Sequence, residues 1–177
     1  NDDSLDIVTA NFNSNDLSIL LALPEGGYSG EIPYIVGQKP SSIALGDLNN
    51  DGLRDIVTAN FNSSDLSILM ALSGGGYAKQ IRYRVGTSPH SVALGDLNKD
   101  GLLDIVAANY LSNDLSILLA LPEGGYAQQV LPSVGWHPRS VALGDLNKDG
   151  LLDIVIANFD ISAVSILMAL PEGRYAE

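Results

Sequence analysis

The chain has 177 residues, a hydrophobic content of 46%, a formal net charge of −12 and no cysteine. This length is sufficient for one globular domain with its own core, and the lack of cysteine excludes disulfides and thiolate metal sites. Nine Lys and Arg residues cannot supply the clustered positive charge that nucleic acids or anionic membrane surfaces require, so both are excluded as partners.

The first segment, residues 1–40, reads as a partial repeat. Subtracting a period of 49 residues from later acidic positions gives Asp2 and Asp6, so the chain begins inside an acidic loop whose first ligand positions are missing. Asp3 stands where the glycine of that loop belongs. We therefore treat the loop at Asp2 and Asp6 as a doubtful metal site.

Two full repeats follow at 41–89 and 90–138, and an incomplete one at 139–177. They share the motif Asp-Leu-Asn-x-Asp-Gly-Leu-x-Asp-Ile-Val, which occurs every 49 residues at Asp47–Val57, Asp96–Val106 and Asp145–Val155. A fixed period of this length indicates a repeat architecture in which each repeat is one supersecondary unit.

Each repeat divides into four short apolar segments separated by turns. In the second full repeat these segments are 91–95, 103–110, 115–121 and 126–134, and Gly, Pro, Asn and Asp mark the turns between them. Segments this short and this rich in Val, Ile and Leu predict strands. Two of the four are nearly continuous apolar runs, so we expect both faces of each sheet to be covered.

Four antiparallel strands in a unit of 40 to 50 residues predict an all-β fold, the β-propeller. The alternative is a linear β-solenoid, whose repeats are usually shorter and whose strands are parallel. Counting segments gives three, four, four and three strands, or about 3.5 blades. Because fewer than four blades cannot close a ring, we expect a homo-oligomer or a longer repeat array that completes it.

The acidic loop of each repeat has the composition of a calcium site. Oxygen-bearing side chains occupy loop positions 1, 3, 5 and 9, a backbone carbonyl serves at position 7, and glycine at position 6 allows the loop to curl. All-oxygen ligation favours Ca²⁺ over zinc or copper, and three carboxylates favour it over Mg²⁺. The expected ligands are Asp47, Asn49, Asp51, the Leu53 carbonyl and Asp55; Asp96, Asn98, Asp100, the Leu102 carbonyl and Asp104; and Asp145, Asn147, Asp149, the Leu151 carbonyl and Asp153.

Two other interpretations of this loop fit the sequence less well. An EF-hand needs Glu at position 12, where this chain has Thr58, Ala107 and Ile156, and it needs flanking helices instead of strands. Simple turn chemistry also favours Asp, Asn and Gly. Three copies that keep oxygen at the same four positions, while position 4 varies, favour the metal site.

The run Ser-Val-Ala-Leu-Gly-Asp-Leu-Asn-Lys-Asp-Gly-Leu-Leu-Asp-Ile-Val-Ala-Ala-Asn resembles the FG-GAP/VCBS repeat of integrin α-subunit propellers and of many secreted bacterial proteins. The resemblance covers essentially the whole chain. It implies calcium in the hairpin between the first two strands of each blade, at the three ligand sets given above. It also implies an extracellular, secreted module for adhesion, ligand binding or scaffolding, without naming the ligand.

The repeats differ most in the Gly-x-x-Pro turns before each first strand. The third such turn contains Trp136, His137 and Arg139, which together have the chemistry to stack on a sugar or to hold a carboxylate. The alternative is drift at tolerant loop positions. A lectin is therefore the second functional hypothesis.

We expect no enzyme activity. The carboxylates are better explained as metal ligands than as an acid–base pair, and no nucleophile motif such as Gly-x-Ser-x-Gly is present. A non-catalytic domain of a larger secreted enzyme remains an alternative. The partner is expected to be a protein or a carbohydrate, without membrane insertion.

Overall fold

The computed structural model describes residues 5–131, 134–160, 162–171 and 174–176. Fifteen strands in this part of the chain form four antiparallel sheets, which we call the first to fourth blades in chain order. The all-β, propeller-type architecture expected from the repeat is therefore confirmed, with open ends instead of a closed ring. The strands are, in the first blade, β1 (Ile7–Asn11), β2 (Asp16–Leu20) and β3 (Ile32–Ile35); in the second, β4 (Pro40–Gly46), β5 (Asp55–Asn60), β6 (Asp65–Leu69) and β7 (Ile81–Arg84); in the third, β8 (Pro89–Gly95), β9 (Asp104–Asn109), β10 (Asp114–Ala120) and β11 (Tyr126–Leu131); and in the fourth, β12 (Pro138–Gly144), β13 (Asp153–Asn158), β14 (Ala163–Leu170) and β15 (Arg174–Ala176).

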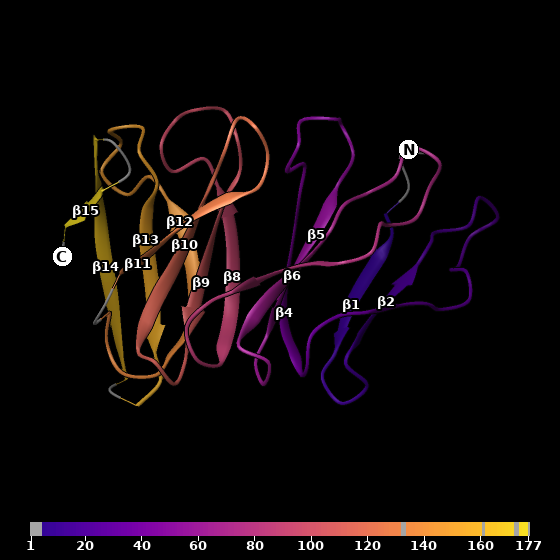
Figure 1. Cartoon of the computed structure of the whole chain (residues 1–177), viewed down its shortest axis with the longest axis horizontal. Helices are drawn as coiled ribbons and strands as arrows, with labels where there is room; N and C mark the ends of the chain where they lie inside the picture. Colours follow the sequence, from indigo (N-terminus) through magenta and orange to yellow (C-terminus); the bar gives the residue numbers. More distant parts are fainter. Residues whose placement is uncertain (1–4, 132–133, 161, 172–173, 177) are drawn as a thin grey trace.

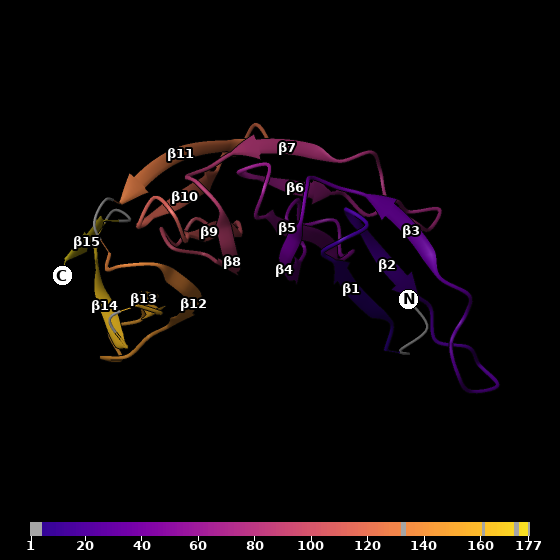
Figure 2. The same ribbon diagram turned by 90° about the horizontal axis from the view of Figure 1, so that it is seen from below.

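The blades stand side by side along an arc (Figure 1). Seen from below, β4, β8 and β12 line the inner side of the arc and β7 and β11 run along its outer side (Figure 2). Because neighbouring strands are antiparallel, the acidic loops lie at one edge of the arc, the upper edge in Figure 1. The turns between the second and third strands lie at the opposite, lower edge.

The pairing register repeats with the sequence. Leu45 pairs with Ile56 in the second blade, and the equivalent partners in the third blade are Leu94 and Ile105. The inner strand of each complete blade also carries an irregularity directly after its first proline, as between Pro89 and Ser91. The 49-residue period is therefore a period in three dimensions as well.

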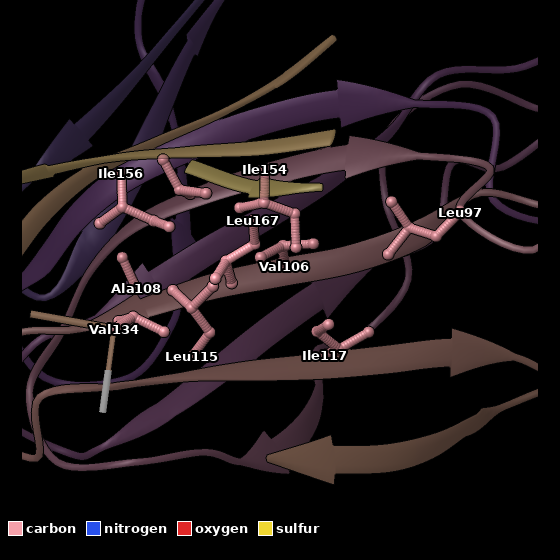
Figure 3. Close-up of a cluster of buried hydrophobic side chains, with 10 residues drawn as sticks. Leu97, Val106, Ala108, Leu115, Ile117, Val134, Ile154, Ile156 and Leu167 are labelled. Atoms are coloured by element: carbon pink, nitrogen blue, oxygen red, sulfur yellow. The ribbon is translucent and has the colours of Figure 1, made fainter. Parts of the chain in front are cut away.

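The core consists of three apolar clusters, one between each pair of successive blades. Between the third and fourth blades, β9 contributes Val106 and Ala108, and β13 contributes Ile154 and Ile156 (Figure 3). All six residues of β9 are buried, as are all six of β5. The continuous apolar runs are therefore explained by sheets that are covered on both faces, as expected.

The two terminal blades are covered on one face only. Ile7 is 41% exposed, whereas the residue at the same repeat position in the third blade, Ile105, is fully buried. At the other end Val164 is 62% exposed, although its counterpart Leu115 is fully buried. Positions that are buried in the internal blades are therefore exposed in the end blades, on the face that no neighbouring blade covers.

The structure corrects the expected strand count by one. Residues 174–176 form β15, where we expected the last blade to lack its fourth strand. The strand is held by pairing of Leu170 with Arg174 and by the Tyr175 hydroxyl, which donates a hydrogen bond of 3.2 Å to the Leu152 carbonyl. Pairing with β14 and one anchored tyrosine are enough to order this short strand.

The exposure of the end blades generates a matched test of the packing. Replacing Ile105 by Ala should lower the free energy of unfolding by about 2–5 kcal/mol, because it leaves a cavity between two blades. Replacing Ile7 by Ala, the same substitution at the same repeat position, should cost less than half as much. Urea unfolding of both variants measures the difference, and equal losses would show that Ile7 is buried in solution.

Candidate functional site: the acidic loops

Each acidic loop joins the first and second strands of its blade, between β4 and β5, β8 and β9, or β12 and β13. The loop reverses direction through two residues with positive φ, at positions 4 and 6. We number the complete acidic loops in chain order, so the second loop joins β8 and β9 in the third blade. In the second loop these two residues are Lys99, with φ of 62°, and Gly101, with φ of 85°. Glycine at position 6 removes the steric cost of this conformation, which explains why it is present in all three loops.

The oxygens at positions 1 and 3 converge on one backbone N–H group. In the second loop, the Asp100 N–H donates to Asp96 Oδ1 at 3.0 Å and to Asn98 Oδ1 at 3.1 Å. Asp96 Oδ2 accepts a further hydrogen bond from the Gly101 N–H at 2.9 Å. The loop backbone therefore collects two side-chain oxygens at the centre of the turn.

The residue at position 5 completes this arrangement. Asp100 Oδ1 accepts from the Leu102 N–H at 2.8 Å, and its Oδ2 accepts from the Asn98 amide at 2.9 Å. The same hydrogen bonds recur in the other two loops with nearly the same lengths. In the third loop, hydrogen bonds from the Leu151 N–H and the Asn147 amide, aided by the charge of Lys99, lower the pKa of Asp149.

Position 9 has a role that the sequence did not reveal. Asp104 is fully buried, and its two oxygens accept hydrogen bonds of 2.8 Å from the backbone N–H groups of Leu97 and Ala120. Asp55 and Asp153 make the equivalent pairs of bonds in their own blades. This aspartate fastens the acidic loop to the end of the third strand.

Burial also affects the charge of these carboxyl groups. Desolvation raises the pKa of Asp104 and Asp55 above the ordinary value, and the nearby loop aspartates act in the same direction, while the two backbone N–H groups oppose both. A carboxylate that is desolvated and surrounded by like charges benefits from a nearby cation. The site is thus electrostatically suited to a positive ligand.

The donor set of each acidic loop has the chemistry of a site for a hard divalent cation. Positions 1, 3, 5 and 9 supply oxygen only, and each carboxylate oxygen that accepts one N–H bond retains a second lone pair. Within the described residues, however, no three Asp, Glu or His side chains approach closely enough to form a metal-ligating cluster. The residue types fit calcium, and the side chains, as described, are turned toward the N–H groups of their own loop. The partial loop at Asp2 and Asp6 lies partly outside the described residues, since Asp2 is not among them.

Neighbouring acidic loops contact each other through position 4. The Asn50 amide donates to the Gly101 carbonyl of the next loop at 3.3 Å. Lys99 reaches the third loop in the same way, since its Nζ lies 3.0 Å from where a Cβ of Gly150 would be. The three loops therefore form a continuous row along the upper edge.

The residues proposed for a ligand site, Trp136, His137 and Arg139, lie on the opposite, lower edge. Trp136 is 64% exposed, His137 stacks on Tyr110 and contacts Asp160, and the Arg139 guanidinium lies 4.9 Å from the ring centroid of Phe159. They are brought together with aromatic side chains from two blades. They do not approach the acidic loops.

The third-strand serines Ser67 and Ser116 link successive blades, because each accepts a hydrogen bond from a glycine in the connection that precedes its blade. The buried Ser116 hydroxyl accepts hydrogen bonds from the Gly86 N–H at 3.2 Å and from the Asn109 amide at 3.0 Å. A Cβ on Gly86 would lie 2.5 Å from that amide nitrogen, so the close approach requires glycine. The Asn109 amide donates to Asp114 as well as to Ser116 and so ties the turn between β9 and β10.

The two backbone hydrogen bonds that Asp104 accepts at loop position 9 lead to a prediction about the metal-free protein. Asp104→Asn should lower the free energy of unfolding by about 1–3 kcal/mol, since an amide nitrogen would face one of two buried N–H donors. Asp96→Asn, at a half-buried position in the same loop, is the control and should cost clearly less. Denaturation in excess chelator measures the free energy of unfolding of both variants, and equal losses would argue against a special role for the two hydrogen bonds of Asp104.

Comparison with known proteins gives a family and a fold. A family described as "FG-GAP-like repeat" matches the chain twice, at residues 47–107 and 96–156. No curated protein matches the chain. Within the described residues, no helix is long and apolar enough to cross a membrane.

Several solved structures have a similar fold. A protein of unknown function from Bacteroides caccae is 15% identical with a TM-score of 0.53, over 96% of this chain and 58% of its own. A functionally unknown protein from Desulfotomaculum acetoxidans is 14% identical with a TM-score of 0.55, over 94% and 58%. BBS1N, solved in complex with ARL6DN, is 13% identical with a TM-score of 0.55, over 97% and 54%. The chain thus spans a little over half the length of these structures. With more than half of its residues matched and the repeat visible in sequence and structure, the chain belongs to the FG-GAP-like repeat family.

Proposed function

We propose that the chain is a calcium-binding propeller module of an extracellular protein, with one structural Ca²⁺ in each complete acidic loop. The observation that carries the proposal is the convergence of the Asp96 and Asn98 oxygens on one N–H group, repeated in all three loops. A cation at such a loop would take oxygen ligands from positions 1, 3 and 5, with the position 7 carbonyl and position 9 nearby.

The role proposed for the ion is mechanical. Each loop holds three aspartates within nine positions, and burial already raises the pKa of Asp55 and Asp104 at position 9 of their loops. A bound Ca²⁺ would neutralise this repulsion and hold the loop in one conformation. Because position 9 is bonded to the third strand, a rigid loop would in turn stabilise the blade.

The open faces of the end blades support further blades as partners. Ile7 and Val164 occupy positions that are buried in the internal blades, where the adjacent blade covers them. An equivalent blade is the surface that fits each face, whether from a second copy of the chain or from a longer repeat array. We propose that such blades complete the ring.

Binding or scaffolding is the use we infer for this module, in line with its extracellular assignment. We propose no catalytic step, because the described loop carboxylates are accounted for as ligands and backbone acceptors. A non-catalytic domain of a larger secreted enzyme is the alternative. Intact mass of the native protein would distinguish them, since that alternative requires a longer chain with a second domain.

Calcium should raise stability in proportion to the occupied sites. If the free calcium concentration is about ten times the Kd of each of three sites, the free energy of unfolding should rise by about 4 kcal/mol. This rise appears as a higher melting temperature in calcium than in chelator. Calorimetry should give a stoichiometry of three for the wild type and of two for Asp100→Ala.

Control variants make this test specific. Asp160→Ala removes an exposed aspartate from the lower edge and should leave the stoichiometry at three. An unchanged melting temperature in excess chelator, with no heat of binding, would contradict the calcium proposal. A stoichiometry of three for Asp100→Ala would instead show that this ligand is assigned wrongly.

A further inference from the structure

Aromatic side chains line the lower edge of the arc, away from the acidic loops. The ring centroids of Phe12 and Phe61 are 6.4 Å apart, and those of Phe61 and Tyr110 are 6.2 Å apart. The next ring, His137, stacks on Tyr110 at 4.4 Å with an angle of 16° between the planes. We call Phe12, Phe61, Tyr110 and His137 the aromatic row. It crosses all four blades, because each member comes from a turn of a different one.

The aromatic row is separate from the hydrophobic core. None of its four members belongs to the apolar clusters between the blades, which are filled by aliphatic residues and by tyrosines near the other edge. Phe12 is 41% exposed, and beyond the row Phe159 and Trp136 are 54% and 64% exposed. Large aromatic surface left in water at one edge costs free energy that burial elsewhere would recover. Phe61, Tyr110 and His137 are half-buried, so the row keeps part of its aromatic surface accessible to a ligand.

The backbone beneath the row is rigidly held. The Phe61 N–H donates to the Lys39 carbonyl at 2.9 Å, and the Tyr110 N–H donates to the Ser88 carbonyl at 2.9 Å. The His137 N–H donates to the Asn113 side chain of the preceding blade at 2.7 Å. These bonds fix each ring-bearing turn to its neighbours. A ligand would therefore meet a preorganised surface, at a small entropic cost.

Two cations flank the aromatic row. The Lys39 ammonium lies 5.2 Å from the centroid of Phe12, at one end, and Arg139 lies over Phe159 at the other. Burial, and then the charge of Arg139, lowers the pKa of His90, whose ring lies between Phe61 and Tyr110, so the middle of the row is uncharged at neutral pH. In the described turns of this edge, Asp160 is the one largely exposed carboxylate, and it contacts His137. The acidic loops are all at the other edge.

We propose that the aromatic row binds an acidic glycan, with sugar rings lying against the aromatic faces and carboxylates paired with Arg139 and Lys39. This inference rests on the proposed binding role and names its ligand class. A pyranose ring offers a flat C–H face that matches a fixed aromatic ring. Arg139 has the planar fork that binds a carboxylate through two parallel hydrogen bonds.

Two other polymers fit this surface less well. Single-stranded nucleic acid also stacks on aromatic rings, but it carries a phosphate on every nucleotide and needs a positively charged groove. The row has one cation at each end, with Phe61 and Tyr110 between them, in a chain of net charge −12. A peptide strand would need a sheet edge or a groove for its backbone. The row consists of side chains on turns, which suits sugar rings.

The test uses hyaluronan oligosaccharides, which alternate a uronic acid with a neutral sugar, and maltohexaose as the uncharged probe. Calorimetry and Trp136 fluorescence follow binding to the full chain at constant calcium. The acidic probe should bind and weaken with salt, whereas maltohexaose should bind at least tenfold more weakly. Equal affinity for both probes, or no binding of the acidic one, would overturn the proposal.

Variants locate the site. Arg139→Gln should weaken binding of the acidic probe by about tenfold or more, since it removes the charged hydrogen bonds to the carboxylate. Tyr110→Ala should weaken it as well, because His137 loses its stacking partner. The matched controls, Lys79→Gln and Tyr28→Ala, change an exposed cation and an exposed aromatic outside the row and should leave affinity unchanged. Equal losses in the controls would refute the site.

Melting curves keep this test independent of the calcium proposal. Because the rings lie outside the core, the row variants should melt within a few degrees of the wild type and retain any stabilisation by calcium. If the wild-type protein is stabilised by calcium but does not bind the acidic glycan, only the glycan site is refuted. Failure of calcium to stabilise the protein while the glycan binds would refute only the metal sites.

Discussion

Face-to-face apolar packing between successive blades is the interaction on which the rest of the structure depends. Each of the three clusters joins the strands of one blade to those of the next, and the second and third blades are covered on both faces. Stability in such a stack is close to a sum of repeat and neighbour terms. A blade with one neighbour therefore has about half of the interface of an internal blade, which is why Ile7 and Ile105 differ so much in burial despite closely similar sequence surroundings.

The stacked sheets hold two edges of different chemistry, the acidic loops at one edge and the aromatic row at the other. At the upper edge, Asp104 connects the acidic loop to the third strand through two backbone N–H groups. At the lower edge, Asn109 and Ser116 connect the turns to the blade and to the preceding Gly86. Both sets of bonds are buried, where an unpaired polar group is costly. The loops and the aromatic row are thus held by the same device, a buried polar side chain that accepts or donates to turn backbone.

Much of the fold was predictable because the repeat occurs three times. The period, the four strands per blade and the loop between the first two strands all followed from turn residues and apolar segments. What the sequence could not provide was long-range: that Ala120 N–H would reach Asp104, or that Tyr110 would stack on His137 from the next blade. The extra strand β15 was missed for a related reason, because three residues carry too little pattern, and its order depends on the contact of Tyr175 with Leu152.

The separation of the two edges has an electrostatic consequence. A strand of six residues at about 3.3 Å per residue is about 20 Å long, and the Debye length at physiological ionic strength is about 8 Å. Charges of the acidic loops are therefore largely screened at the aromatic row by the solvent between them. Three bound divalent ions would change the formal charge from −12 to −6, since each adds two positive charges. Because this change occurs at the far edge, an anionic ligand at Arg139 would respond to it weakly. Any strong coupling between the two edges would have to pass through the sheets. It would run from the backbone hydrogen bonds of Asp104 along β9 to the turn that begins at Tyr110.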